Sequence, residues 1–304
     1  MIKCKGCGIT LQVKDINKVG YTPDINNELC QRCFKLKNYN VLTHEGIKID
    51  NEKLIDKINK LNAFVFFLTD FINLDSDVIN YYRRIKSNKV LVLTKADIIP
   101  KNIKYNKIIA KIKDIYEINE DILFTSSKKR LNISNISKLC LEQKKVVFVG
   151  FTNAGKSSLI NALTGSDITV SRLENTTQEI IKLVADGITI YDAPGLMDDI
   201  KRENIPKDSI NPRSYQLSNK HYLFINGIKL NIKEDCNFTI YVGNDIKVLR
   251  RRETEDIKTE IIVPKNCDVV LKGLGFISFK ESSLISLSTN EYEIRPSIIG
   301  DIYE

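Results

Sequence analysis

The stretch GFTNAGKS, from Gly150 to Ser157, has the residue types and spacing of a loop that binds phosphate. It follows the apolar run KKVVFV and precedes a stretch with helical periodicity, which is the context such a loop requires. Gly150 and Gly155 allow the backbone to turn tightly, so that successive N–H groups point at phosphate oxygens. Lys156 can reach the β- and γ-phosphates, and the Ser157 hydroxyl can bind Mg²⁺. The alternative is a chance match in an ordinary loop. The nucleotide contacts expected here are Gly150, Asn153, Ala154, Gly155, Lys156, Ser157 and Ser158.

A second group that faces the phosphates is expected in the stretch TIYDAPG. Asp192 ends an apolar run, where its carboxylate can hold a magnesium-bound water, and Gly195 can offer its N–H to the γ-phosphate. Between the two motifs, in ENTTQE, either Thr176 or Thr177 can add a second hydroxyl to Mg²⁺. We favour Thr177 slightly, and ordinary loop threonines are the alternative. The residues expected to take part in catalysis are Lys156, Thr177 and Gly195.

The group expected to select the base lies earlier in the chain. LVLTKAD ends in Thr94, Lys95, Ala96 and Asp97, which resembles the NKxD motif of GTPases with threonine in place of the usual asparagine. A carboxylate at Asp97 accepts two hydrogen bonds from the N1–H and N2–H₂ edge of guanine, which adenine lacks. The stem of Lys95 would pack on the base plane. TSSKK resembles the SAK motif, so Ser126, Ser127 and Lys128 are expected beside the guanine oxygen.

The order of these motifs along the chain is unusual. Conventional GTPases place the phosphate loop first and the guanine motifs last, whereas here TKAD and SSK precede GFTNAGKS, the threonine pair and DAPG. A sheet can keep its strands in place while the chain is cut and rejoined, because the ends of a domain often lie close together. The sequence therefore predicts a circularly permuted nucleotide domain, in which the first half of the chain supplies the base pocket.

The amino-terminal segment contains two cysteine pairs, Cys4 with Cys7 and Cys30 with Cys33. Two CxxC pairs in a short segment are typical of a tetrahedral zinc site with four thiolate ligands. Four unrelated buried thiols and a redox CxxC are the alternatives. A segment this short buries little core, so zinc would provide much of its folding free energy. The remaining cysteines, Cys140, Cys236 and Cys267, are interpreted as core or neutral residues.

Three regions are expected from the hydrophobic patterns. Residues 1–45 form the zinc module, 46–205 the permuted GTPase domain, and 206–304 a β-rich carboxyl-terminal domain. In the second region, short apolar runs such as AFVFFLTD and KVLVLTKAD alternate with potential helices, which predicts an α/β domain with a parallel sheet. In the third, HYLFINGIKLNI and DVVLKGLGFISF alternate like short strands joined by turns.

The composition indicates which class of partner the protein could bind and where in the cell it is expected. The 304 residues carry a formal net charge of +8, which suggests a polyanionic partner. The run KVLRRR, ending in Arg250, Arg251 and Arg252, is either a basic contact or a solvated strand end. The longest apolar run, AFVFFL, is far too short to cross a bilayer, and MIKCKGCGIT lacks the apolar core of a signal peptide. A cytoplasmic protein without a membrane partner is expected.

The whole pattern resembles the YqeH-type circularly permuted GTPases. The resemblance rests on the ordered nucleotide motifs, the cysteine pairs, CQRCFKLKNYN and LKGLGFISF. It implies GTP and GDP as ligands, and GTP-controlled binding to ribosomal RNA, the small ribosomal subunit or its precursor during assembly. The sequence departs from the family pattern where ENTT replaces PGTT, and its last region is short for the family.

Two residues bear on the rate of hydrolysis. Leu196 follows DAPG, where many GTPases have a glutamine that orients the attacking water, so hydrolysis is expected to be slow alone and stimulated by the ribosome. Asn153 stands where potassium-activated GTPases have an asparagine that helps to hold K⁺; the alternative is a local hydrogen bond at the helix start. Leu196 keeps open a second hypothesis, a non-hydrolysing GTP-binding RNA scaffold. A zinc-dependent DNA-binding regulator is disfavoured because no arginine-rich recognition helix is found, so DNA is not an expected partner.

Overall fold

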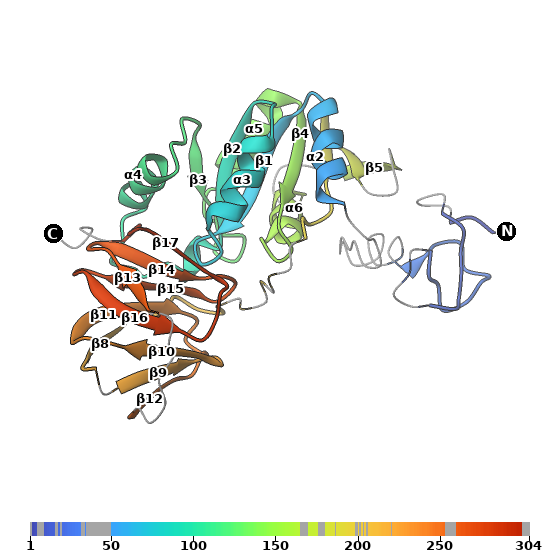
Figure 1. Ribbon diagram of the computed structural model, residues 1–304. Helices are drawn as coiled ribbons and strands as arrows, with labels where there is room; N and C mark the ends of the chain where they lie inside the picture. Colours follow the sequence, from blue (N-terminus) through green and yellow to red (C-terminus); the bar gives the residue numbers. More distant parts are fainter. Residues whose placement is uncertain are drawn as a thin grey trace. The chain divides into compact units, whose positions relative to one another are not determined.

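The computed structural model of the chain describes residues 2–4, 9–15, 18, 20–31, 34, 50–164, 170–175, 180–185, 187–197, 200, 202, 204, 206–219, 221–252 and 260–299. These residues form two compact units (Figure 1). The first unit comprises residues 1–69, 81–94 and 123–198, and the second comprises residues 70–80, 95–122 and 199–304. The second unit thus contains Lys95 and Asp97 together with the β-rich part. The three domain boundaries expected from the sequence stay a prediction.

The first unit is built on a seven-stranded sheet with the order β3-β2-β1-β4-β7-β6-β5. β4 pairs in parallel with both β1 and β7, whereas β6 pairs antiparallel with both β7 and β5. The sheet is therefore mixed, while the sequence predicted a parallel one. The strands are β1 (Phe64–Asp70), β2 (Lys89–Thr94), β3 (Ile122–Phe124), β4 (Lys145–Gly150), β5 (Val170–Asn175), β6 (Ile181–Ala185) and β7 (Ile188–Asp192).

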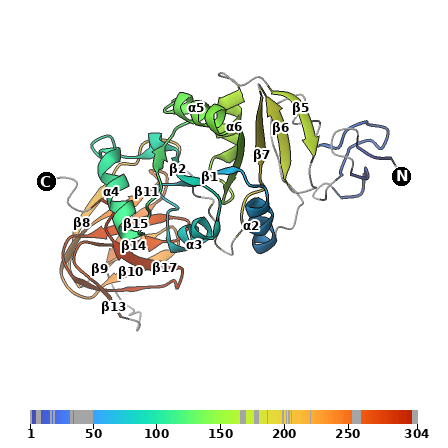
Figure 2. The same cartoon turned by 90° about the horizontal axis from the view of Figure 1, so that it is seen from above.

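The central strands are continuous apolar runs because both faces of the sheet are covered. On one face, Phe66 and Phe148 stack with ring centroids 4.8 Å apart, in a cluster that includes residues of α5 and α6 (Figure 2). On the other face, Phe67 meets the ring of Tyr82 from α3 edge to face at 5.6 Å. The helices are α2 (Asn51–Lys60), α3 (Ser76–Arg84), α4 (Tyr105–Ile115), α5 (Ile133–Gln143) and α6 (Lys156–Thr164), with a 3₁₀ turn η1 (Ala96–Ile98). Within the described ranges, none of these helices has the length and apolar content needed to span a bilayer.

The β-rich part of the second unit consists of two five-stranded sheets. One has the order β12-β9-β10-β16-β13 and the other β17-β14-β15-β11-β8, with neighbouring strands antiparallel. The strands are β8 (Arg213–Leu217), β9 (His221–Ile225), β10 (Ile228–Ile232), β11 (Cys236–Val242), β12 (Val248–Arg252), β13 (Ile261–Val263), β14 (Cys267–Leu271), β15 (Gly275–Phe279), β16 (Ser283–Leu287) and β17 (Tyr292–Pro296).

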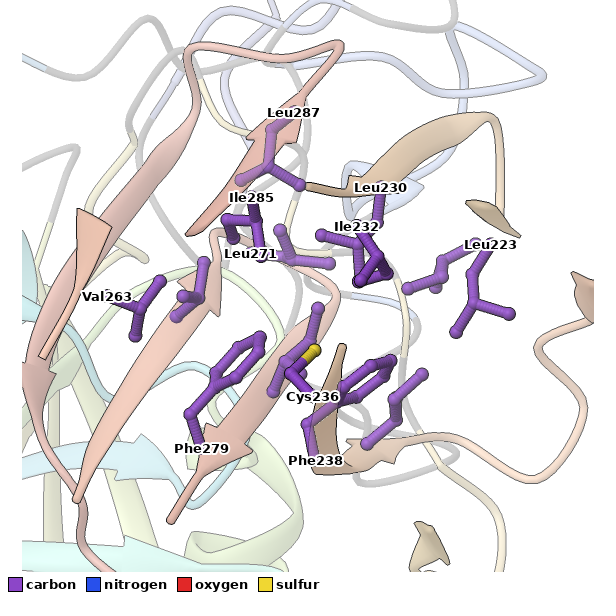
Figure 3. Packing of buried hydrophobic residues seen from close by; sticks show 14 of the residues in the cluster. Leu223, Leu230, Ile232, Cys236, Phe238, Val263, Leu271, Phe279, Ile285 and Leu287 are labelled. Atoms are coloured by element: carbon purple, nitrogen blue, oxygen red, sulfur yellow. The ribbon is translucent and has the colours of Figure 1, made fainter. Parts of the chain in front are cut away.

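A single apolar cluster joins the inner faces of these two sheets. Leu223, Leu230 and Ile285 from the first sheet lie in the same cluster as Phe238 and Phe279 from the second (Figure 3). Alternation along each strand places these residues inward, between the two sheets, as expected for a β-sandwich. The expectation of a β-rich carboxyl-terminal part is confirmed.

The outer face of the second sheet is also covered within this unit. Phe276 meets Phe71 edge to face at 5.4 Å, and Arg295 donates to Tyr116 Oη at 3.1 Å and also to the carbonyl of Leu74. Residues 70–80 and 95–122 therefore pack as a layer on the sandwich.

Candidate nucleotide site

The predicted phosphate loop joins β4 to α6 with the geometry that its glycines require. A Cβ on Gly150 would lie 2.3 Å from the carbonyl oxygen of Leu68, so no other residue fits beside β1. Gly155 has φ of +83°, in the left-handed region that favours glycine. α6 begins at Lys156, so the loop ends at a helix N-terminus, where backbone N–H groups and the helix dipole favour phosphate. Ala154 is buried, Ser157 is partly buried, and Asn153 and Ser158 are exposed.

The loop lysine forms a buried ion pair with the aspartate of DAPG. Lys156 Nζ lies 2.6 Å from Asp192 Oδ1, and their side chains are 7% and 0% exposed. The structure therefore brings together the two residues that the sequence assigned to the phosphates and to the magnesium-bound water. The hydroxyl of Ser157 and the carboxylate of Asp192 are the oxygen ligands that Mg²⁺ prefers, so this donor set fits the ion.

The DAPG segment runs beside the phosphate loop as an extension of the sheet. Ala193 N donates to Phe148 O at 3.1 Å, and Leu196 N donates to Gly150 O at 2.9 Å. Gly195 lies against Thr152, whose amide nitrogen would be 3.1 Å from a Cβ at that position. The Leu196 side chain is fully buried, so it cannot orient a water molecule for attack.

Thr94, the first residue of TKAD, contacts the phosphate loop within the first unit. Its Oγ1 lies 2.7 Å from the carbonyl oxygen of Ala154 and 3.0 Å from that of Thr69. One hydroxyl has one proton, so it serves one of these carbonyls at a time. The side chain is buried, and a Cβ on Gly155 would lie 3.4 Å from the same oxygen. A threonine therefore fits at this position with its hydroxyl satisfied.

The TSSKK segment is held at the end of β3. Thr125 N donates to Leu93 O at 2.9 Å, which places the segment beside the end of β2. Ser126 is buried, and its Oγ accepts a hydrogen bond from Lys129 N at 3.0 Å. Ser127 is partly buried and Lys128 is exposed. The buried Ser126 thus shapes the turn whose backbone was predicted to contact guanine.

In the second unit, Lys95, which was predicted to pack on the base, is held by an aspartate that the sequence did not predict. Lys95 has a left-handed φ of +53°, and its Nζ lies 2.6 Å from Asp70 Oδ2. Asp70 is 1% exposed, and its Oδ1 also accepts hydrogen bonds from the amides of Ile72 and Asn73. Asp70 follows the apolar run of β1, and a carboxylate at the carboxyl end of a buried strand was a signal that could have identified it. Asp97 lies in η1 and is partly exposed.

Three of the predicted groups lie partly or wholly outside the described residues. Thr176 and Thr177 fall between β5 and β6 and are not described, so the choice between them stays open. Cys7 and Cys33 are not described either. Among the residues the structure does describe, no three His, Cys, Asp or Glu side chains gather into a metal-binding cluster.

Cys4 and Cys30, the two described residues of the cysteine pairs, are in contact. Cys30 N donates to Cys4 Sγ at 3.2 Å, and both side chains are 2% exposed, in a small cluster with Leu11. A sulfur that accepts an amide hydrogen bond fits a thiolate zinc ligand, because such partners orient and stabilise the ligand. Burial raises the pKa of the Cys140 thiol to about 12 and that of Cys236 to about 11. These two thiols are therefore inert core residues, as expected.

The comparisons with protein families agree with this geometry. Residues 76–199 match the family described as RsgA GTPase, and residues 145–266 match the family described as 50S ribosome-binding GTPase. The first match contains Asp97 and then Lys156, so the guanine motif precedes the phosphate loop within one matched segment. The chain is a circularly permuted GTPase. GTPase activity and binding of GTP and GDP, both predicted from the motifs, are confirmed.

Individual relatives of this GTPase differ in how much of the chain they match. The chain is 26% identical to the Bacillus subtilis protein YqeH over 92% of its own length and 93% of that protein. It is 30% identical to the small ribosomal subunit biogenesis GTPase RsgA of Bacillus velezensis, over 35% of the chain and 38% of the relative. Among solved structures, YjeQ from Thermotoga maritima covers 46% of this chain and 51% of its own, with 22% identity and a TM-score of 0.34.

Proposed function

We propose that this GTPase is a nucleotide-controlled switch that binds ribosomal RNA in the small ribosomal subunit or its precursor. The observation that carries the switch is the buried pair between Lys156 and Asp192. It supports the proposal because it joins the loop lysine to Asp192, the residue of DAPG that is proposed to hold the magnesium-bound water. The printed name of the relative RsgA, a small ribosomal subunit biogenesis GTPase, supports the choice of particle.

The chemistry proposed for this cluster begins with an exchange of partners. When a nucleotide binds, the Nζ of Lys156 leaves Asp192 and donates to β- and γ-phosphate oxygens, which carry more negative charge than one carboxylate. Asp192 would then be available to hold a magnesium-bound water, and the Ser157 hydroxyl would be a direct ligand of the ion. Thr177 is proposed as the second hydroxyl ligand, and the N–H of Gly195 as the sensor of the γ-phosphate. A bound Mg²⁺ would neutralise the charge that develops on the phosphates.

Potassium and zinc are the two further ions that we propose. Asn153 has a left-handed φ of +64° and an exposed side chain, so its amide oxygen can turn toward a K⁺ ion beside the phosphates. Cys4, Cys7, Cys30 and Cys33 would hold one zinc. The Cys30 amide bonded to Cys4 Sγ is the observation that supports bringing the two pairs together.

An RNA contact is proposed on the outer face of the sheet β12-β9-β10-β16-β13. On this face Phe224 and Leu249 are direct cross-strand neighbours, and they remain 41% and 43% exposed. The next pair is Tyr222 with Arg251, and Lys229 Nζ lies 4.5 Å from the centre of the Tyr222 ring. Aromatic rings on which bases stack, interleaved with cations that pair with phosphates, are the chemistry of single-stranded RNA recognition on a sheet.

The edge of the same sheet adds positive charge. All four residues from Leu249 to Arg252 in β12 are exposed, and Arg250 Nη2 lies 3.1 Å from His221 Nε2. KVLRRR therefore lies in a solvated edge strand. This position is compatible with a basic contact surface and with an ordinary solvated strand end, the two interpretations of the sequence. Arg251 lies on the same face as Tyr222 and Phe224, and Arg250 and Arg252 are exposed on the same edge strand, so all three arginines are proposed as phosphate contacts.

Co-sedimentation with purified small ribosomal subunits tests the proposal. We expect salt-sensitive binding that is stronger with a non-hydrolysable GTP analogue than with GDP. Replacing Arg250, Arg251 and Arg252 by glutamine should weaken it while GTP affinity is unchanged. The matched control replaces Lys101, Lys104 and Lys107, which are exposed and lie in the same unit, and should bind as the parent does. If the protein did not bind small subunits at low salt, the proposal of a ribosomal partner would be wrong. If it bound them equally with both nucleotides, the proposal of a nucleotide-controlled switch would be wrong.

A second function, a non-hydrolysing GTP-binding RNA scaffold, is favoured by one observation. Leu196 is buried where many GTPases orient the attacking water, so the described site lacks that group at this position. Phosphate release in potassium buffer distinguishes the two functions, because the scaffold would release none.

A further inference from the structure

Asn51, the first residue of α2, forms hydrogen bonds with the backbone of Met197, which follows DAPG and Leu196 in the chain. Met197 N donates to Asn51 Oδ1 at 3.0 Å, and Asn51 Nδ2 donates to the carbonyl oxygen of Met197. A carboxamide that pairs with both the N–H and the C=O of one residue fixes the backbone in position and in orientation, because both bonds must be made at once. Asn51 and Met197 belong to the same compact unit, although 146 positions separate them.

The other proton of the Asn51 amide extends this contact to the phosphate loop. Asn51 Nδ2 lies 3.1 Å from the hydroxyl of Tyr81, whose ring meets that of Phe151 edge to face at 5.5 Å. Phe151 is in the phosphate loop, and its backbone forms a parallel bridge with Leu196. The contacts close a ring through Asn51, Met197, Leu196, Phe151 and Tyr81. We call this ring the Asn51 clasp.

We infer that Asn51 is a positioning residue for the γ-phosphate sensor. Before Gly195, Ala193 N donates to Phe148 O. After it, Leu196 N donates to Gly150 O, and the clasp holds Met197. A backbone donor acts on a γ-phosphate oxygen only when it is held about 2.7–3.1 Å from it. The inference rests on the role proposed for Gly195. It adds that a side chain outside every nucleotide motif determines where that N–H lies.

The clasp should affect GTP and GDP differently. GDP has no γ-phosphate, so its binding does not depend on where the Gly195 N–H lies. Loss of the clasp should therefore weaken a GTP analogue more than GDP. A residue that only stabilised the fold would weaken both nucleotides equally, or neither.

The same helix offers a matched control. Asn59 Nδ2 donates to Arg84 O at 3.1 Å, and Lys86 N donates to Asn59 Oδ1 at 2.9 Å. This is the same two-point contact between an asparagine and backbone, from α2 of the same unit, and both asparagines are partly exposed. The backbone that Asn59 holds lies at the end of α3 and outside the DAPG segment.

The experiment measures the dissociation constants of a non-hydrolysable GTP analogue and of GDP for the full chain and three variants. For Asn51→Ala we expect the preference for the analogue to fall by about fivefold or more, the effect of losing ordinary hydrogen bonds. Asn51→Asp keeps the acceptor for Met197 N but places a carboxylate against the Met197 carbonyl, so the preference should fall as well. Asn59→Ala should keep the parent preference.

The outcomes separate the clasp from the proposed sensor. If the parent prefers the analogue and both Asn51 variants fold and keep that preference, the clasp has no positioning role. An equal fall in Asn59→Ala would show a general effect of α2 and would also overturn the inference. If the parent itself binds both nucleotides equally, the role of Gly195 fails, and the inference fails with it. Melting temperatures of all three variants identify any that do not fold.

Discussion

Lys156 Nζ lies 2.6 Å from Asp192 Oδ1 in the first unit, and both side chains are buried. A buried charge is costly unless it is paired, so each residue makes the burial of the other tolerable. The same lysine is expected to bind the phosphates of GTP. The ion pair therefore joins two residues that are both proposed to act on the nucleotide.

Lys156→Ala should reduce phosphate release at least about 100-fold, because the γ-phosphate loses the cation that stabilises its charge in transfer. It should also lower the free energy of unfolding by about 3–5 kcal/mol, because the buried carboxylate of Asp192 loses its ion-pair partner. Single-turnover hydrolysis and denaturant unfolding measure the two effects. Lys145→Ala is the control, since Lys145 is an exposed residue at the opposite end of β4. Parent-like hydrolysis by Lys156→Ala would move the phosphate site elsewhere.

Asp97→Asn should weaken GTP binding by about 100-fold, from the loss of two charge-assisted hydrogen bonds to guanine. Xanthosine triphosphate should bind this variant better than GTP, because xanthine has a carbonyl where guanine has an amine. Competition between the two nucleotides measures the change. Asp121→Asn, at an exposed position in the same unit, should leave base preference unaltered. Normal GTP affinity of Asp97→Asn would argue against this base pocket.

Thr94→Val should weaken GTP and GDP equally, by about fivefold, because the variant keeps the shape but loses the hydroxyl that bonds to the loop carbonyl of Ala154. Thr94→Asn, which restores the residue usual in GTPases, should bind more tightly than Thr94→Val. Equilibrium titration with both nucleotides tests this order. An unchanged affinity of Thr94→Val would mean that the hydrogen bond does not support the loop.

The nucleotide motifs and the central strands could be predicted because each depends on local sequence. KVVFVG is apolar at every buried position after its first residue, and FVFFLTD is apolar at every buried position except Thr69 and Asp70 at its end, so both patterns indicate interior strands. The antiparallel pairing of β5 and β6 was missed because VSRLEN is largely polar and only its partner strands specify it. Local pattern does not determine the direction of a strand at the edge of a sheet.

The residues that position the site could not be predicted in the same way. Asp70 meets Lys95, and Asn51 meets Met197, only after distant segments have folded together. Neither residue belongs to a motif, and an isolated aspartate or asparagine has many ordinary explanations in a sequence. The terminal position of Asp70 in β1 was the stronger signal of the two.

The four cysteines of the amino-terminal pairs should be protected from iodoacetamide at pH 8 in zinc-loaded protein and should react after chelation of the metal. Cys140 and Cys236 should stay unlabelled in both samples, because burial raises their pKa values to about 12 and about 11, far above the pH of the reaction. Mass spectrometry of the labelled peptides identifies each site. Rapid labelling of Cys4 or Cys30 in protein with one bound zinc would contradict the zinc assignment.

Hydrolysis should be faster in K⁺ than in Na⁺, and Asn153→Ala should remove most of that difference because it removes the proposed amide ligand. Asn161→Ala, farther along α6, is the control. Initial rates in matched chloride salts measure the effect. Equal rates of the parent in both salts would leave Asn153 without a role in ion binding and would not affect the assignment as a GTPase.

We propose that this permuted site hydrolyses GTP and responds to the small ribosomal subunit. The decisive measurement is phosphate release from GTP and from ATP in potassium buffer, with and without purified small subunits. We expect slow release from GTP alone, a clear increase with small subunits, and none from ATP because Asp97 cannot pair with adenine. If folded protein that binds GTP released no phosphate from it in either condition, the proposal would be wrong and the non-hydrolysing scaffold would be supported.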